Sequence, residues 1–193
     1  SEAAAGTPVA LGVQRSEAGE YYNSVVGLAE NGAIFTRYDK HHLVPFGEYI
    51  PFAQYFSALP ISALADLSGS GFAPGTGPQI FDLGKLGTML PLICYEAVFA
   101  HDVNAAPERG ALMIHISNDA WFGTSAGPLQ HLQMVQMRSL ENGRWFMRAT
   151  NTGVTAIINH RGQIVERAPQ FERTVLRGDV QARVGNTPFM VVG

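Results

Sequence analysis

A succession of short, strand-like apolar segments constrains the fold of this 193-residue chain more than any other feature. The segments are separated by turn residues, a pattern typical of β-strands. Strands are expected at residues 8–14, 21–30, 32–39, 79–83, 86–94, 110–117, 145–151 and 174–180, and in a hairpin within 153–167 that turns at His160-Arg161-Gly162. The dipeptide Asn31-Gly32 also predicts a hairpin, because both residues accept the positive φ of a tight turn.

Two helices are expected between the later strands. One should run from about Ala97 to Glu108 and the other over residues 127–146, where Pro128 suits the first turn and apolar residues recur near helical spacing. Strands outnumber helices, so the pattern predicts a mixed sheet covered by helices on one face, with its other face free to meet a second sheet. The expected fold class is an α/β layered sandwich.

Residues 50–78 fit no helix or strand. This segment is apolar at first and rich in Gly, Ser and Pro later, and its aromatic residues argue against disorder. Loops of this length in a compact domain are usually functional. We therefore predict an apolar, lid-like loop within a domain that covers residues 1–193.

Composition excludes several classes of function. The formal net charge is −3, from 13 basic and 16 acidic residues, which gives no electrostatic case for a nucleic-acid partner. Cys94 is the only cysteine, and the histidines lack the spacing of metal ligands, so no metal site is predicted. The sequence contains no run of 18 or more apolar residues. Both ends resemble cut edges, and we expect the chain to be part of a longer protein.

Cys94 closes the apolar run "LGTMLPLIC", at a predicted junction between a strand and a helix. Such a position stabilises a thiolate and can offer a backbone N–H to an oxyanion. Lys40 could assist as a nearby ammonium, and Glu48, or failing that Glu96, could transfer protons. The alternative is that Cys94 is a buried packing residue and that Lys40 and Glu48 are ordinary loop charges.

The segments "YDKHHLVPFGEYIPF", "LICYE" and "ISNDAWFG" occur in that order and resemble the carbon–nitrogen hydrolase (nitrilase) superfamily. Within it they are similar to the extramembrane domain of bacterial apolipoprotein N-acyltransferases, and the resemblance extends from about Thr7 to the C-terminus. It implies a nitrilase-like αββα sandwich with a Glu-Lys-Cys triad.

The resemblance also implies roles for particular residues. Cys94 matches the nucleophile, Lys40 the triad lysine and Glu48 an additional supporting glutamate. Tyr95 and Glu96 match the supporting residues that follow the nucleophile. Asn118 and Phe46 belong to the expected substrate-binding set, and so does Trp121, for which core packing is an alternative.

One departure concerns the general-base glutamate of the triad. In the family it belongs to a Trp-Pro-Glu type motif, and no such motif occurs here. We expect that glutamate, the N-terminal strand and most membrane helices before residue 1, and a last membrane helix after Gly193. The chain alone is therefore predicted to be inactive.

The resemblance implies a ping-pong acyl transfer through a Cys94 thioester, without a cofactor or a metal. The donor would be a phospholipid, and the acceptor the N-terminal amine of a diacylglyceryl-cysteine on an apolipoprotein. The domain would face the periplasm from the bacterial inner membrane, as part of a monomer. Two alternatives stay open: a soluble nitrilase-type amidase acting on a small amide or nitrile, and a non-catalytic fragment.

Overall fold

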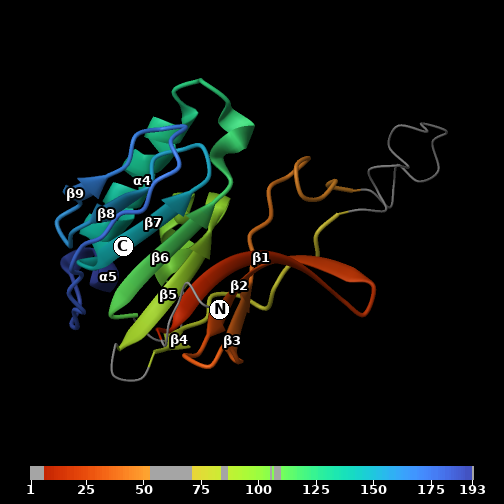
Figure 1. Ribbon diagram of the computed structural model, residues 1–193, viewed down its shortest axis with the longest axis horizontal. Coiled ribbons are helices and arrows are strands. Elements are labelled where there is room, and N and C mark those ends of the chain that lie inside the picture. Colours follow the sequence, from red (N-terminus) through yellow and green to blue (C-terminus); the bar gives the residue numbers. More distant parts are fainter. Residues whose placement is uncertain (1–6, 53–70, 84–86, 105, 107–109, 193) are drawn as a thin grey trace.

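Two β-sheets form the framework of the molecule (Figure 1). The computed structural model describes residues 7–52, 71–83, 87–104, 106 and 110–192. The first sheet is antiparallel, in the order β1 (Val9–Glu17), β2 (Glu20–Leu28), β3 (Ile34–Asp39).

The hairpin between β2 and β3 is confirmed. Gly32 adopts a φ of 81°, which a side chain would strain, and the Asn31 side chain accepts a hydrogen bond from the Ala33 N–H at 3.0 Å. This turn sets the direction of β3, so that the chain leaves the sheet at Lys40.

The second sheet has six strands in chain order, with a parallel centre and antiparallel edges. Its strands are β4 (Phe81–Asp82), β5 (Thr88–Ile93), β6 (Leu112–Ser117), β7 (Trp145–Thr150), β8 (Ala156–Ile158) and β9 (Ile164–Arg167). Strands β5, β6 and β7 are parallel, while β4, β8 and β9 pair antiparallel. The carboxyl ends of the three parallel strands therefore lie at one edge, the usual place for a site in such sheets.

The helical elements follow the strands of the second sheet. They are the 3₁₀-helices η3 (Cys94–Val98) and η4 (Asp119–Phe122) and the α-helices α3 (Ala100–Asn104), α4 (Gly127–Asn142) and α5 (Pro188–Val192). Helix α4 confirms the main predicted helix, with Pro128 in its first turn. It ends at Asn142, because Gly143 takes the left-handed conformation (φ 60°) that closes a helix.

Two predicted elements differ from the structure. The helix expected over Ala97–Glu108 is present as the short α3, and the 3₁₀-helix η3, which starts at Cys94 itself, precedes it. Residues 105 and 107–109 of that prediction lie outside the described residues. The strand expected at 174–180 is irregular in the structure. Val175 is 80% exposed whereas Val180 packs against the core, so the apolar residues of this segment do not form one buried face.

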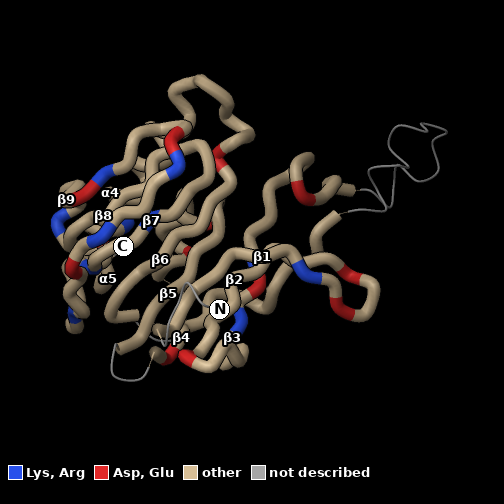
Figure 2. Tube along the Cα trace, viewed as in Figure 1, with Lys and Arg blue, Asp and Glu red and all other residues tan. Residues whose placement is uncertain are grey.

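Alternation along β5 produces the two layers of the core. Leu90 and Leu92 belong to a cluster with residues of α3 and α4, whereas Met89 and Ile93 pack with Val25 and the rest of a cluster shared by both sheets. Strands β5 and β6 carry no charged side chain (Figure 2), as expected for strands buried on both faces. The predicted layered α/β sandwich is thus confirmed.

The lid-like loop predicted at 50–78 lies largely outside the described residues, which omit 53–70. The described segment that follows is fixed to the first sheet and to the turn before it. The Phe72 N–H donates to the Glu48 carbonyl, and the Gly75 N–H donates to the Lys40 carbonyl, both at 2.8 Å. These bonds anchor the segment beside Lys40 and Glu48.

Gly12 allows the two sheets to approach each other. A Cβ atom at this position would lie 2.7 Å from Ile116 Cγ2 of β6. We predict that Gly12→Val overpacks this interface and lowers the free energy of unfolding by about 1–3 kcal/mol in urea titrations. Leu11→Val, at a side chain 46% exposed, is the matched control and should change stability little. Equal midpoints for the two variants would contradict this packing.

Candidate active site

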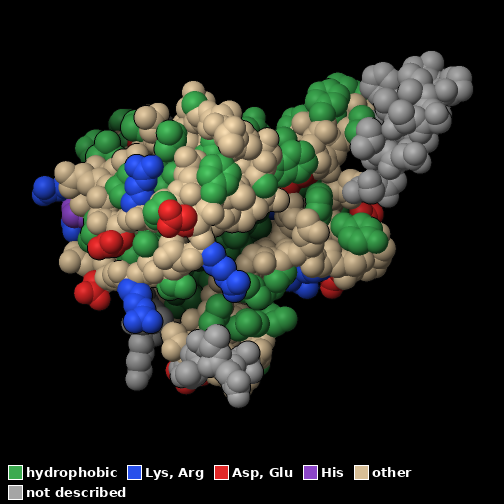
Figure 3. All heavy atoms as spheres, turned by 45° about the horizontal axis from the view of Figure 1, so that its top comes forward, with side chains coloured by type: hydrophobic (Ala, Val, Ile, Leu, Met, Phe, Trp, Pro, Cys, Tyr) green, Lys and Arg blue, Asp and Glu red, His purple; other side chains and the backbone are tan. Residues whose placement is uncertain are grey.

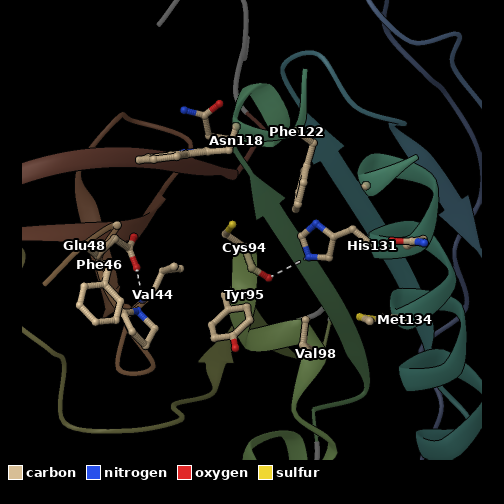
Figure 4. A pocket seen from close by; sticks show the side chains of 15 residues that line it. Val44, Phe46, Glu48, Cys94, Tyr95, Val98, Asn118, Phe122, His131 and Met134 are labelled. Carbon is tan, nitrogen blue, oxygen red and sulfur yellow. Dashed lines mark hydrogen bonds between the residues drawn. The ribbon is translucent and has the colours of Figure 1, made fainter. Parts of the chain in front are cut away.

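A cavity of about 560 Å³ opens at the carboxyl end of β5 (Figure 4). Residues 44–48 line one side of it, and residues of η4 and α4 line the other. Cys94 lies between these two sides (Figure 4). Most of the lining is apolar, with Val98, Phe122 and Met134 among its side chains. The cavity therefore offers an apolar chamber next to a thiol.

Cys94 is held in an unusual backbone conformation. Its φ is 51°, in the left-handed region that costs a non-glycine residue on the order of 1–3 kcal/mol. Its carbonyl oxygen lies 2.9 Å from His115 Nε2 and 3.1 Å from His131 Nε2. Cys94 is also the first residue of η3, whose five residues provide free N–H groups but only one turn of aligned dipoles. The helix dipole expected from the sequence is therefore short.

Lys40 and Glu48 form a buried ion pair beside the cavity. Lys40 is 1% exposed, and its Nζ lies 2.5 Å from Glu48 Oε2. Glu48 also accepts hydrogen bonds from Asn23 Nδ2 at 2.5 Å and from the Val44 N–H at 2.8 Å. Glu48 lines the cavity. The loop-charge alternative for these two residues is contradicted by their burial.

A tight turn over residues 44–49 presents Phe46 to the cavity. The Glu48 N–H donates to the Val44 carbonyl at 2.8 Å, and the Phe46 N–H donates to the Tyr49 carbonyl at 2.7 Å. Phe46 has a φ of 60° and is 80% exposed. A strained backbone that holds a phenyl ring at a cavity mouth is typical of a binding segment.

Glu96 connects the end of the first sheet to the cysteine turn. Its carboxylate is fully buried and accepts hydrogen bonds from Tyr38 Oη at 2.6 Å, from Ile93 N at 2.7 Å, and from the N–H groups of His41 and His42 at 2.8 and 3.3 Å. Both carboxylate oxygens are thus occupied. Glu48, in contrast, faces the cavity, so the geometry gives Glu96 a positioning role.

The pKa values of two side chains that contact Glu96, Tyr38 and His41, are shifted. Burial and the Glu96 carboxylate raise the pKa of Tyr38 well above its ordinary value of 10.0. Burial opposes protonation of His41, yet hydrogen bonding to Glu96 and the charges of Glu96 and Asp102 raise the net pKa of His41 above 6.5.

The other sequence-predicted residues also lie around the cavity. Tyr95, Asn118 and Trp121 line it, together with Phe46. The Asn118 Oδ1 atom is engaged by Ala120 N at 3.1 Å and by Asn151 Nδ2 at 2.5 Å, which fixes the start of η4. Trp121 is 72% exposed, so the core-packing alternative for this residue is wrong.

A buried polar network behind Cys94 was missed by the sequence analysis. Arg148 of β7 donates to Asp119 Oδ2 at 2.5 Å and lies 2.6 Å from His115 Nδ1, and His131 Nδ1 lies 3.1 Å from Asp119 Oδ1. The histidines seemed scattered in the sequence. The available signal was Arg148, which lies two positions after the buried Phe146 and therefore on the same face of the strand. A buried arginine needs a buried partner.

The network sets the protonation of its members. Burial and then the Arg148 charge lower the pKa of His115 well below 6.5, so this ring is neutral. Burial acts to raise the pKa of Asp119, but hydrogen bonding to His131 and the Arg148 charge lower it below 3.8 overall. Asp119 and Arg148 are therefore a charged pair with no solvent exposure of either side chain.

In the ranges that the structure describes, no cluster of three or more His, Cys, Asp or Glu side chains is arranged to hold a metal ion. Within the same ranges, no helix is both long and apolar enough to cross a membrane.

The chain belongs to the carbon–nitrogen hydrolase family, whose model matches residues 3–189. It is 47% identical over 170 residues to the apolipoprotein N-acyltransferase of Azotobacter vinelandii, a match that covers 88% of this chain and 32% of that protein. It is 40% identical over 190 residues to the enzyme of the same name from Photobacterium profundum, covering 94% of this chain and 36% of that protein. The chain thus spans about a third of the length of these relatives.

Solved structures confirm the nitrilase-like α/β fold. XC1258 from Xanthomonas campestris, a CN-hydrolase superfamily protein, is similar with a TM-score of 0.62 at 19% identity, over 87% of this chain and 60% of that one. Nit3 from Saccharomyces cerevisiae, of the nitrilase superfamily, gives the same TM-score and identity over 88% of this chain and 56% of that one.

The buried Lys40–Glu48 pair should be far more important for stability than an exposed pair. We predict that Glu48→Gln, which leaves the Lys40 ammonium buried without its carboxylate, lowers the free energy of unfolding by about 3–5 kcal/mol. Glu17→Gln, at an exposed pair with Arg15, should cost less than about 1 kcal/mol. Urea titration measures both, and similar costs would contradict the burial of the pair.

The neutral His115 should make stability depend on pH. Between its lowered folded-state pKa and 6.5, the unfolded chain binds a proton that the folded chain excludes. The free energy of unfolding therefore rises with pH across this window and falls on acidification below about pH 6.5.

We predict that His115→Gln flattens the pH dependence of the free energy of unfolding relative to the unaltered chain. Urea titrations between about pH 4.5 and about pH 7.5 measure it, because this range brackets the pKa of about 6.5 of an unfolded histidine. The exposed His101→Gln should leave the slope unchanged. Parallel curves for the chain and its His115→Gln variant would contradict the assignment of a neutral, buried ring.

Proposed function

We propose that this chain is the acyl-transfer domain of an apolipoprotein N-acyltransferase. The whole enzyme would be about as long as the relatives that the chain matches. The observation that carries the proposal is the apolar cavity that meets Cys94 beside a buried Lys40–Glu48 pair. The identities of 40–47% to proteins of that name support it. A long apolar chamber suits a fatty-acyl chain, and a small polar substrate would not need it.

In the first half-reaction, the Cys94 thiolate attacks the ester carbonyl of a phospholipid, such as phosphatidylethanolamine. The carbonyl oxygen becomes an oxyanion, which the Lys40 ammonium and the Tyr95 N–H stabilise. The C–O ester bond breaks, the lysophospholipid alkoxide takes a proton, and a thioester remains on Cys94.

In the second half-reaction, the N-terminal amine of a diacylglyceryl-cysteine on an apolipoprotein attacks the thioester. The amine loses a proton, the C–S bond breaks, and an amide forms while the thiolate is regenerated. The attack of the amine forms a second oxyanion, which the Lys40 ammonium and the Tyr95 N–H also stabilise. The fatty-acyl group has then moved from lipid to protein without a cofactor.

We assign the proton transfers to a carboxylate from the longer protein, outside this chain. Glu48 is engaged by Lys40, Asn23 and Val44, and both oxygens of Glu96 are occupied. Neither carboxylate is therefore free to remove and return a proton during turnover. This division of labour predicts that the 193-residue chain by itself is inactive, since loss of a general base costs about 10²–10⁴-fold in rate.

The proposed substrates require the site to face a bilayer. Aromatic side chains surround the cavity on the outside, with Phe46, Trp121 and Phe122 exposed by 80%, 72% and 39%. Figure 3 shows many hydrophobic side chains on the surface of this side of the molecule. Exposed aromatic rings suit a membrane interface. We propose that the domain acts as a monomer on the periplasmic side of the bacterial inner membrane.

The second candidate is a soluble amidase that uses water as its second nucleophile. The amidase of Nesterenkonia AN1 shares the fold, with a TM-score of 0.58 at 17% identity. Such an enzyme would form the same thioester from a small amide. The acyl donor therefore distinguishes the two candidates.

The test is the intact mass of the full-length protein after incubation with phosphatidylethanolamine vesicles and no acceptor. We predict one added acyl group on Cys94, absent from Lys40→Ala and retained by the control Arg37→Ala, whose side chain is 47% exposed. The 193-residue chain should show no adduct. Rapid turnover of small amides without any lipid adduct would favour the amidase, and an unreactive thiol would favour a non-catalytic chain.

A further inference from the structure

Two imidazole rings converge on the backbone oxygen of Cys94. It lies within hydrogen-bonding distance of His131 Nε2, from α4, whose ring lines the cavity (Figure 4). It also lies within hydrogen-bonding distance of His115 Nε2, from β6. His115 has no solvent exposure and His131 is 5% exposed. Because a carbonyl oxygen only accepts hydrogen bonds, each Nε2 atom must carry a proton to bind it. For His131, whose Nδ1 faces the Asp119 carboxylate, this means that both ring nitrogens carry protons, as an imidazolium paired with Asp119.

The far sides of both rings are fixed in turn. Arg148 donates to His115 Nδ1, which makes that ring a neutral Nε2–H tautomer. Asp119 Oδ1 lies against His131 Nδ1 and also accepts from the Ser117 hydroxyl at 2.7 Å. The charged Arg148–Asp119 pair therefore holds the two rings in the orientation that directs them at Cys94.

The carbonyl of Cys94 and the N–H of Tyr95 are opposite ends of one planar peptide group. The described chain contains no cis peptide bond, and in a trans peptide these two bonds point in opposite directions. Two donors on the oxygen thus fix the direction of the Tyr95 N–H, and each hydrogen bond to the oxygen polarises the peptide group and strengthens a bond donated by that N–H by about 10–30%. They also hold Cys94 at its strained φ of 51°.

We propose that His115 and His131 are positioning residues: they aim and polarise the Tyr95 N–H toward the oxyanion that forms when Cys94 attacks a carbonyl. The inference rests on the proposed function only in requiring a Cys94 nucleophile, and it does not depend on a lipid donor. Neither histidine touches the substrate carbonyl in this account. Their contribution is made through the peptide group between Cys94 and Tyr95.

The test compares two reactions of the same thiol in the full-length protein. Acylation by p-nitrophenyl butyrate passes through an oxyanion, whereas alkylation by iodoacetamide does not. The primary variants are His131→Phe, which keeps a ring without a donor, and His131→Gln, whose amide nitrogen can replace Nε2–H. His101→Phe, at a side chain 91% exposed, is the matched control.

We expect His131→Phe to lower the ratio of acylation rate to alkylation rate by about 10-fold or more, since removal of an oxyanion donor outright costs about 10²–10³-fold. His131→Gln should restore most of the ratio, and His101→Phe should not change it. His115→Phe, tested alongside, removes the other donor and should lower the ratio as well. If His131→Phe does not fold, His131→Asn, whose shorter amide cannot reach the carbonyl, takes its place.

Two results would overturn the inference. An unchanged ratio in a folded His131→Phe protein would mean that the ring only fills space. Equal losses in both reactions without rescue by glutamine would mean a purely structural role. Normal ester acylation without any lipid adduct would instead refute the lipid donor and leave this inference intact, so the two failures are distinguishable.

Discussion

The site depends on one buried carboxylate that ties the two sheets together. Glu96 accepts hydrogen bonds from the segment that follows β3 and from the last residue of β5, so it fixes the start of the Lys40 loop against the turn that carries Cys94. A fully buried carboxyl group is tolerated only when it is well bonded, and four donors meet this one. The stacking of His42 on Phe99 adds a second contact between the same two segments.

Around that connection, the molecule holds Cys94 from two sides with two separate buried ion pairs. The Lys40–Glu48 pair belongs to the first sheet and its following turn, and it borders the cavity. The Arg148–Asp119 pair belongs to the second sheet and orients two imidazoles behind the cysteine. Burying charge is expensive, and a protein retains such pairs where they fix a geometry. Here they support a thiol on a strained backbone beside an apolar chamber, an arrangement that suits the proposed acyl transfer.

Much of this was predictable from local sequence signals, and the remainder depends on tertiary contacts. Asn31-Gly32 and the Pro128 helix gave correct elements, because their causes are local. The quoted motifs predicted Lys40, Glu48 and Cys94 as site residues; Glu48 and Cys94 line one cavity and Lys40 pairs with Glu48, while their catalytic roles stay predictions. The helix after Cys94 was overestimated because sequence periodicity does not reveal a 3₁₀ turn. The convergence of His115 and His131 on one carbonyl was invisible, since 16 positions separate residues that meet only through the packing of α4 on β6.

The central claim is that the apolar cavity binds an acyl chain with its ester carbonyl at Cys94. The most direct measurement is an experimental structure of the full-length Cys94→Ala protein with a bound phospholipid. The account predicts an acyl chain between Phe46 and Met134, with the ester oxygen directed at the Lys40 ammonium and the Tyr95 N–H. A lipid that lies elsewhere, or whose ester group is turned away from position 94, would contradict it.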